Sequence, residues 1–333
     1  MQPNKTLFFA IIGLAIALVA GMFVAKTLFA DQIPLPNGQE KIAIKIVAAP
    51  IIKPWVDQAA QTFNGRNPNT QVEIAAAESL IPISQFRPGV APQTAQPAAW
   101  LAEAGFVVGM AGQSDLRFNE PQSVASTPLT WGAFKDKQDA LIQAYGPLSW
   151  DSLHAKATSG SDFLTVVIAS PQNSAEGLAA LISATAAHLN KQSLSAADVN
   201  GAEGWLNETF EENTRIPLGK PAEAFAATTG RSIGDLGLLS RVSWQSVPAL
   251  QNRADFVLTE AQPKVILDFP LAIWADASPQ AQETAKTFRA FLLEEAQQQT
   301  LAQSNLERAA GPGVVADGAA AVALQRWAER VIK

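Results

Sequence analysis

The first strand–helix–strand pattern after residue 40 constrains the fold of this chain more than any other feature. Residues 41–49 (KIAIKIVAA) are rich in β-branched side chains and almost continuously apolar, and Pro50 ends the run. Such a strand is typical of a parallel sheet in which both faces are buried. Residues 53–64 place apolar side chains at helical spacing, and residues 71–76 alternate as a second strand does. Strand, helix and strand in this order predict an α/β fold.

Later parts of the chain continue this alternation. We expect strands at 123–131, 163–169, 236–244, 255–259 and 264–274, and helices ending at 190 and covering 205–210, 221–229, 279–292 and 319–332. Two of these strands contain a proline, Pro128 and Pro270, which interrupts a ladder of hydrogen bonds and marks an edge or a crossover. Two crossover strands would join two lobes through a hinge and leave a cleft for a small ligand. Two unrelated bends at sheet edges are the alternative interpretation.

The composition excludes several classes of function. The chain has 333 residues, a net charge of −6 and no run of basic residues, which argues against a nucleic-acid partner. It contains no cysteine, so disulfides, thiolate metal sites and cysteine nucleophiles are excluded. The two histidines, His154 and His188, lie far apart in the sequence and provide too little material for a zinc site or a catalytic triad. We therefore expect no metal, no cofactor and no enzymatic activity.

The N-terminal region predicts a membrane anchor. Residues 7–25 carry no charge and lie between Lys5 and Lys26, and a helix of these 19 residues nearly spans a hydrocarbon core of about 30 Å. Residues 28–30 (LFA) place a bulky side chain where a signal-peptide cleavage site has a small one. We therefore expect residues 1–32 to form a cytoplasmic tail and an uncleaved single-pass anchor in the cell membrane, with the bulk of the chain extracytoplasmic. A cleaved secretory signal is the alternative.

The segment 170–177 (SPQNSAEG) carries the clearest local signal for a binding site. It follows a predicted strand and begins a helix, so unpaired backbone N–H groups and the positive end of the helix dipole lie there. Ser170, Asn173 and Ser174 add side-chain hydrogen-bond donors. Such a turn is able to hold an oxygen-rich or anionic ligand. Ordinary N-capping of the helix is the alternative interpretation.

Together these features resemble the type 2 periplasmic solute-binding proteins, in particular the branch that includes molybdate- and sulfate-binding components of ABC importers. The residues that carry the resemblance are KIVAAPIIKPWVDQAAQTFN, VASTPLTWGAF, SWDSL followed by FLTVVIASPQNSAEGLAAL, and VILDFPLAIWADASPQAQETAKTFRAFLLEEAQQQTL. They cover most of residues 41–306. The resemblance implies a two-lobed α/β fold with two crossover strands, in which lobe 1 comprises 33–128 and 256–333 and lobe 2 comprises 129–255.

The resemblance also implies a function and a set of binding residues. A solute-binding protein of this kind holds a small molecule or anion between its lobes and delivers it to the permease of an ABC importer or another membrane protein. The implied ligand contacts are Pro50, Ile51, Ser79, Thr127, Gln172, Asn173, Ser174 and Trp244. Ala49 and Pro50 stand where oxyanion-binding members place Ser or Thr, which argues against molybdate or sulfate themselves. The alternative is an interaction or scaffold domain that keeps the fold and binds no small ligand.

Overall fold

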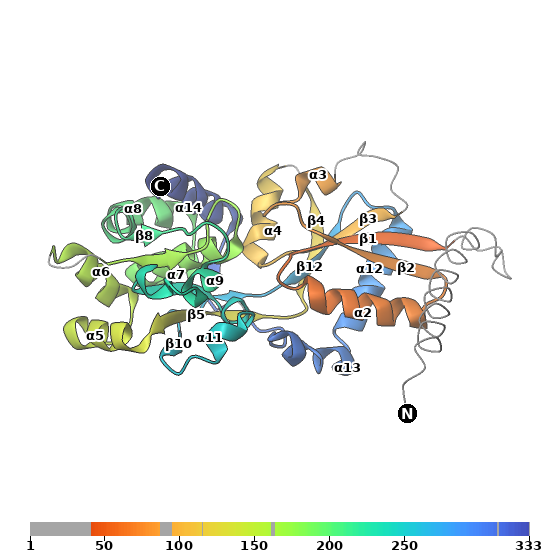
Figure 1. Ribbon diagram of the computed structural model, residues 1–333. Helices are drawn as coiled ribbons and strands as arrows, with labels where there is room; N and C mark the ends of the chain where they lie inside the picture. The colour runs from red at the N-terminus through yellow and green to blue at the C-terminus, as the bar shows by residue number, and fades with distance from the viewer. Residues whose placement is uncertain (1–40, 87–94, 115, 161–163, 312, 333) are drawn as a thin grey trace, which may run out of the picture. The chain divides into compact units, whose positions relative to one another are not determined.

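The computed structural model of the chain describes residues 41–86, 95–114, 116–160, 164–311 and 313–332. The described residues from Ile42 onward belong to one compact unit (Figure 1). The predicted anchor at 7–25, and with it the whole of 1–32, lies outside the described residues. Within the described ranges, none of the helices combines the length and the apolar character that crossing a bilayer requires.

The first sheet contains five strands in the spatial order β2-β1-β3-β12-β4 (Figure 1). Its strands are β1 (Ile42–Ala48), β2 (Thr70–Ala76), β3 (Gln96–Leu101), β4 (Phe118–Ser123) and β12 (Pro270–Trp274). β1 lies between β2 and β3 and is parallel to both, while β12 is antiparallel to β3 and β4. Ile44, Ile46 and Val47 on β1 are fully buried, which confirms the buried parallel strand predicted from the apolar run.

Two long helices pack together against this sheet, α2 (Lys53–Arg66) and α12 (Pro279–Leu292). Phe63 of α2 meets Phe288 of α12 edge to face, with ring centroids 5.2 Å apart. Each helix has a proline in its first turn, where a backbone N–H would have no partner within the helix. The shorter elements near this sheet are α3 (Ile83–Phe86), α4 (Gly105–Ala111), η1 (Gly112–Ser114), α13 (Glu295–Gln298) and η3 (Leu301–Ser304).

The second sheet has the spatial order β10-β5-β9-β6-β8, and a short strand, β11, pairs separately with β5. Its strands are β5 (Thr127–Phe134), β6 (Val166–Ile168), β8 (Thr214–Arg215), β9 (Leu236–Ser240), β10 (Phe256–Glu260) and β11 (Ile266–Leu267). The helices of this region are α5 (Lys135–Tyr145), α6 (Trp150–Thr158), α7 (Ala175–Leu189), α8 (Ala196–Phe210), α9 (Pro221–Ala226), η2 (Gly230–Ser232), α10 (Arg241–Gln245) and α11 (Pro248–Gln251). α7 contacts β5, β6 and β9 and is buried over most of its length.

The chain passes between the two sheets twice. It leaves β4 through residues 124–126 to enter β5, and it returns from β11 through Asp268 and Phe269 to β12. The Asp268 carboxylate accepts hydrogen bonds from the Gly105 amide at 2.7 Å and from the Ser123 hydroxyl at 2.9 Å. These bonds hold the second crossover beside the end of β4, where the first begins. The predicted two-lobed α/β fold is thereby confirmed.

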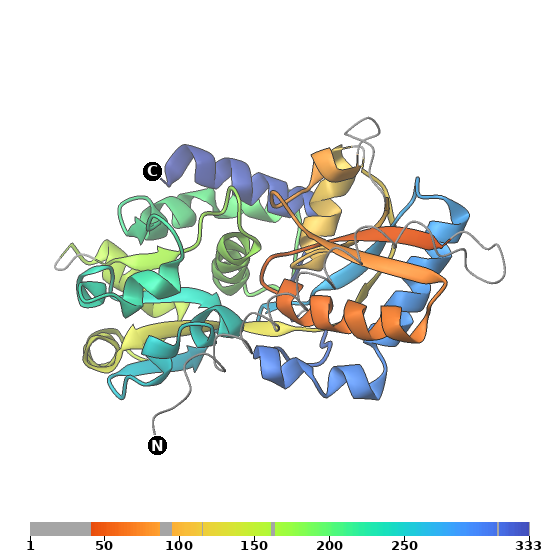
Figure 2. The same ribbon diagram turned by 45° about the vertical axis from the view of Figure 1, so that its right-hand side comes forward.

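The C-terminal part differs from the predicted division into lobes. Its last two elements are β13 (Val315–Ala316) and α14 (Gly318–Val331), and the strand that pairs with β13 is β7 (Ser193–Leu194). The sequence assigns 256–333 to lobe 1, whereas β10 pairs with β5 in the second sheet and β13 pairs with β7. α14 lies alongside α8, with its first turn beside α4 (Figure 1, Figure 2). Trp327 of this helix donates a hydrogen bond to Asn207 Oδ1 at 2.9 Å. Helix α14 thus contacts both α8 and α4, and its assignment to a lobe stays a prediction.

A second difference concerns 236–244, which the sequence predicts as one strand. Strand β9 ends at Ser240, and α10 begins at the next residue. Ser240 Oγ accepts a hydrogen bond from the Ser243 amide at 3.2 Å and thereby caps the helix. The apolar side chains continue across this boundary, so hydrophobicity alone does not mark it.

Candidate functional site

Three of the cavities formed by the described residues adjoin one another, where loops from both sheets meet. Their volumes are about 290, 560 and 460 Å³. Glu103 lines the first and second cavities, Glu176 lines the second and third, and Asn173 lines the first and third. We refer to the three together as the cleft. Its walls include the loop after β1, the loop after β3, the start of α7 and the residues that lead into α9.

Five of the eight residues that the resemblance implies as ligand contacts line the cleft. They are Pro50, Ile51, Ser79, Asn173 and Ser174. Thr127 and Trp244 lie in the interior instead, where Thr127 Oγ1 accepts a hydrogen bond from the Val242 amide at 3.3 Å and Trp244 Nε1 donates to a backbone carbonyl at 2.9 Å. Gln172 lies between Ser170 and Asn173, which line the third cavity, and its Oε1 accepts a hydrogen bond from the Ser170 hydroxyl at 2.7 Å. The binding roles of all eight stay predictions.

The turn that leads into α7 is tightly packed, and backbone amides at the helix start have acceptors within the protein. A Cβ atom at Gly177 would lie 2.3 Å from the Ala169 carbonyl oxygen, so this position has no room for a side chain. Ser174 caps the helix, with its hydroxyl accepting a hydrogen bond at 3.2 Å from the amide two residues on. The Ala175 amide donates to Glu103 Oε2 at 3.1 Å. A carboxylate from the loop after β3 therefore occupies the helix start where the sequence suggests a ligand.

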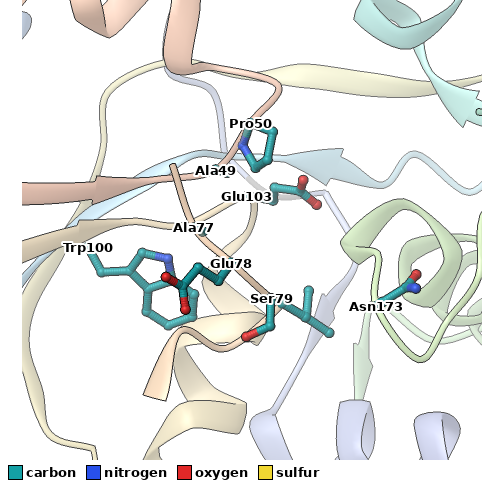
Figure 3. Close-up of a pocket in the computed structure, with 9 residues that line it drawn as sticks. Ala49, Pro50, Ala77, Glu78, Ser79, Trp100, Glu103 and Asn173 are labelled. Atoms are coloured by element: carbon teal, nitrogen blue, oxygen red, sulfur yellow. The ribbon is translucent and has the colours of Figure 1, made fainter. Parts of the chain in front are cut away.

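Two carboxylates, Glu103 and Glu176, dominate the electrostatics of the cleft. Glu176 is nine-tenths buried, and its Oε1 accepts hydrogen bonds from the Ser240 amide at 2.9 Å and from the Ser240 hydroxyl. The pKa of Glu103 is raised to about 7, first because burial disfavours the charged form and second because the Glu176 carboxylate repels it. The hydrogen bond from the Ala175 amide opposes this rise. Figure 3 shows the Glu103 carboxylate directed toward the side of the cavity on which Asn173 lies.

Sequence reasoning missed both carboxylates. Glu103 follows β3 (QPAAWL), which lies outside the expected strands because alanine and proline give it neither β-branched character nor clear alternation. Its one sequence signal is the short apolar run at 98–102 that ends directly before the acidic residue, with a glycine two positions further on. Glu176 lies inside the 170–177 motif, where an acidic residue in the first helical turn has an ordinary explanation as a partner of the helix dipole.

Comparison with known families shows which class of protein has this arrangement. A family model described as "Bacterial extracellular solute-binding protein" matches residues 44–305. The chain belongs to this family. The resemblance that the sequence indicates is therefore confirmed for this solute-binding protein, and an extracellular position for the bulk of the chain agrees with its family.

Solved structures of other binding proteins share the fold of this solute-binding protein. The sulfate-binding protein SubI from Mycobacterium tuberculosis H37Rv is 14% identical with a TM-score of 0.57, covering 88% of this chain and 92% of that one. The periplasmic binding protein AfuA from Actinobacillus pleuropneumoniae, with fructose-6-phosphate bound, is 14% identical with a TM-score of 0.59, covering 87% and 99%. A family 1 extracellular solute-binding protein from Bifidobacterium longum subsp. infantis is 12% identical with a TM-score of 0.51, covering 88% and 96%. Comparison with curated proteins finds no match.

The two histidines of this solute-binding protein flank a single tryptophan. The rings of His154 and His188 each stack on Trp205, with centroid distances of 4.9 and 4.8 Å. His154 Nδ1 also lies 2.9 Å from the Thr209 hydroxyl. Across the part of the chain that the structure describes, no group of three or more histidine, aspartate or glutamate side chains is placed to hold a metal ion.

Proposed function

We propose that this solute-binding protein captures a small polar molecule in the cleft and delivers it to the permease of an ABC importer or to another membrane protein. The observation that supports the proposal is that loops from both sheets line one continuous set of cavities. A ligand that contacts both sides stabilises the closed arrangement of the lobes relative to an open one. The crossovers at 124–126 and 268–269 would act as the hinge for this motion.

The cleft offers hydrogen-bonding groups beside apolar walls. Its second cavity, of about 560 Å³, has the size of an ordinary small-molecule site. We propose as ligand contacts Pro50, Ile51, Ser79, Asn173 and Ser174, together with Glu103 and Glu176. For Thr127, Gln172 and Trp244 we propose a supporting role, because their side chains are held by hydrogen bonds within the protein. Of the two ligand types that the sequence suggests, an anion suits the cleft less than a neutral oxygen-rich molecule, since the two carboxylates repel negative charge.

We also propose that residues 7–25 tether the chain to the cell membrane. The support is the uncharged run of 19 residues and the membership of an extracellular family. By the positive-inside rule we expect the N-terminus before this run to lie in the cytoplasm and the described residues to lie outside it. A tether of this kind keeps the binding protein near its permease and raises the effective concentration of one for the other.

Native mass spectrometry of the full chain, purified in detergent, tests the binding function. We expect a retained small molecule, and we expect that molecule to stabilise the chain by about 2.7 kcal/mol at a hundredfold excess over its dissociation constant. Asn173 is exposed, so Asn173→Trp should fill the cleft and abolish retention without unfolding the protein. The matched control is Glu283→Gln, at an exposed position of α12, which should retain the molecule. A chain that retains nothing, gains no stability from sugars, amino acids, anions or amines, and still captures a membrane partner would favour the scaffold alternative.

A further inference from the structure

The backbone donors at the helix starts of the cleft are already used by the protein itself. The Ala175 amide donates to the Glu103 carboxylate at 3.1 Å, and the Glu176 amide donates to the Ser174 hydroxyl at 3.2 Å. The Ser240 amide, directly before α10, donates to the Glu176 carboxylate at 2.9 Å. An oxyanion would have to displace a protein carboxylate from two of these three amides. The helix starts in the cleft therefore offer little to an anionic ligand.

Each of the same two carboxylates accepts hydrogen bonds through only one of its two oxygens. Glu103 accepts through Oε2 and Glu176 accepts through Oε1, and among the described residues no donor contacts the second oxygen of either group. Glu176 is 9% exposed and lines the second and third cavities. Neither second oxygen is among the buried side-chain atoms that lack a partner, so both are open to the cavities and to solvent. A ligand that displaces solvent from these oxygens has to supply donors in its place, because an unpaired carboxylate oxygen is unfavourable once water is excluded. The unused oxygens thus indicate a ligand that donates hydrogen bonds.

The lining of the cleft also has an excess of negative charge. Glu78, Glu103 and Glu176 line it, and Lys220 is the one cation among the described lining residues. The Lys220 side chain is 79% exposed and lies 3.5 Å from the Glu223 carboxylate, so its charge is largely in solvent. Carboxylates in a cleft attract cations and repel anions, and the effect strengthens where water is partly excluded.

We propose that the ligand of the cleft is a small organic cation with at least two N–H donors, a primary amine or a guanidinium, whose charged group lies between Glu103 and Glu176. This inference rests on the proposed function and names the ligand class of the same site. The N–H groups would donate to Glu103 Oε1 and Glu176 Oε2. The carbon skeleton of the ligand would lie against apolar residues of the second cavity, among them Pro54, Leu239 and Val242.

The ionisation of Glu103 gives this site a characteristic pH dependence. The groups that face its carboxylate are the Glu176 carboxylate and the Ala175 amide, while Glu78 and Lys220 line the same cleft. Because its pKa is about 7, the Glu103 carboxyl is largely protonated below neutral pH and ionised above it. The affinity for a cation should therefore rise from about pH 6 to about pH 8, and the affinity for an anion should fall.

Isothermal titration calorimetry of the full chain in detergent tests the inference. The probes are putrescine, agmatine and ethanolamine, with tetramethylammonium as a cation without N–H donors, sulfate and molybdate as anions, and glucose as a neutral molecule. We expect at least one of the three amine probes to bind, more tightly at about pH 8 than at about pH 6. Each of the other probes should bind at least about tenfold more weakly. Tetramethylammonium has no N–H donor, the anions are repelled by the carboxylates, and glucose donates hydrogen bonds but carries no positive charge.

Two substitutions assign this binding to the carboxylates. Glu176→Gln should weaken amine binding by about tenfold or more, because it removes a charge-assisted hydrogen bond. Glu283→Gln, at an exposed position of α12, should leave the affinity unchanged. Circular dichroism shows whether the Glu176→Gln variant folds. If that variant does not fold, Glu103→Gln is used for the same test. The glutamine side-chain oxygen at position 103 can still accept the hydrogen bond from the Ala175 amide.

The outcomes separate this inference from the proposed function. If glucose, sulfate or molybdate binds and none of the amine probes does, the inference is overturned while the solute-binding function stands. A retained natural ligand that, once identified, contains neither an amine nor a guanidinium group leads to the same conclusion. Amine affinity that is unaffected by both glutamine variants overturns the placement of the cation between the two carboxylates. A chain that binds no probe and retains no molecule overturns both proposals.

Discussion

Substitution of Glu103 by glutamine should change the way that the stability of this protein depends on pH. The native protein keeps the Glu103 proton up to about pH 7, whereas an ordinary carboxyl in the unfolded chain releases its proton near 4.5. The stabilisation linked to this proton is fully present below about pH 4.5 and is lost as the pH rises through 7. The interval between the two pKa values corresponds to about 3 kcal/mol. Glutamine does not ionise, and its amide oxygen can still accept from the Ala175 amide, so the variant should escape this loss.

Urea unfolding followed by tryptophan fluorescence measures this effect at about pH 4.5, 6 and 8. The free energy of unfolding of Glu103→Gln minus that of the wild type should grow by about 3 kcal/mol over this range, in favour of the variant. Glu283→Gln is the control, because its side chain is exposed on α12 and the difference should stay constant. If the Glu103→Gln difference were also constant, or moved in favour of the wild type, Glu103 would be ionised at neutral pH as exposed carboxylates are. The electrostatic description of the cleft would then be wrong.

Three further predictions concern packing and membrane attachment. Gly177→Ala should lower the free energy of unfolding by about 1–3 kcal/mol, since the new Cβ would lie 2.3 Å from the Ala169 carbonyl oxygen, and an unchanged thermal midpoint would contradict this. Trp244→Phe should lower it by about 1–3 kcal/mol, because the Thr130 carbonyl loses the donor that now lies 2.9 Å away, as a urea titration would measure. Deletion of 1–32 should move the chain from the membrane fraction to the supernatant after ultracentrifugation, and a truncated chain that still pellets would show a second tether.

Much of the scaffold could be predicted because it depends on local patterns. The apolar run of β1 and the helical spacing in α2 identified a buried strand and its covering helix without reference to the rest of the chain. Short strands escaped prediction for the opposite reason. β3, β8 and β13 have two to six residues, too few for a clear pattern, and partners that lie far away in sequence. Their formation depends on the tertiary contacts that place them next to longer strands.

The places of the predicted site residues in the fold have physical explanations, while their binding roles stay predictions. Residues in the loops after β1 and β2 line one cleft together with the start of α7. The two loops meet because the carboxyl ends of these parallel strands lie at one edge of the first sheet, whereas α7 follows β6 of the second sheet. Trp244 was expected there by position, but its indole fills a slot in the core. A Cβ at Gly132 or Gly237 would lie 2.6 or 3.0 Å from the indole ring, so these two glycines make the space that it occupies. That slot joins β5, β9 and α10, and no local pattern around Trp244 indicates it.

The start of α7 shows why this fold does not by itself determine the charge of its ligand. The amide groups and the dipole at a helix start attract negative charge whatever its source. In this protein the negative charge comes from Glu103. Its carboxylate accepts a hydrogen bond from the Ala175 amide, 72 residues further along the sequence. The backbone geometry that elsewhere suits an oxyanion therefore holds a carboxylate of the chain itself, and that carboxylate lines the cleft together with Glu176. The proposed preference of this cleft for a cation follows from these two side chains, and it illustrates that a shared fold does not fix the charge of the ligand.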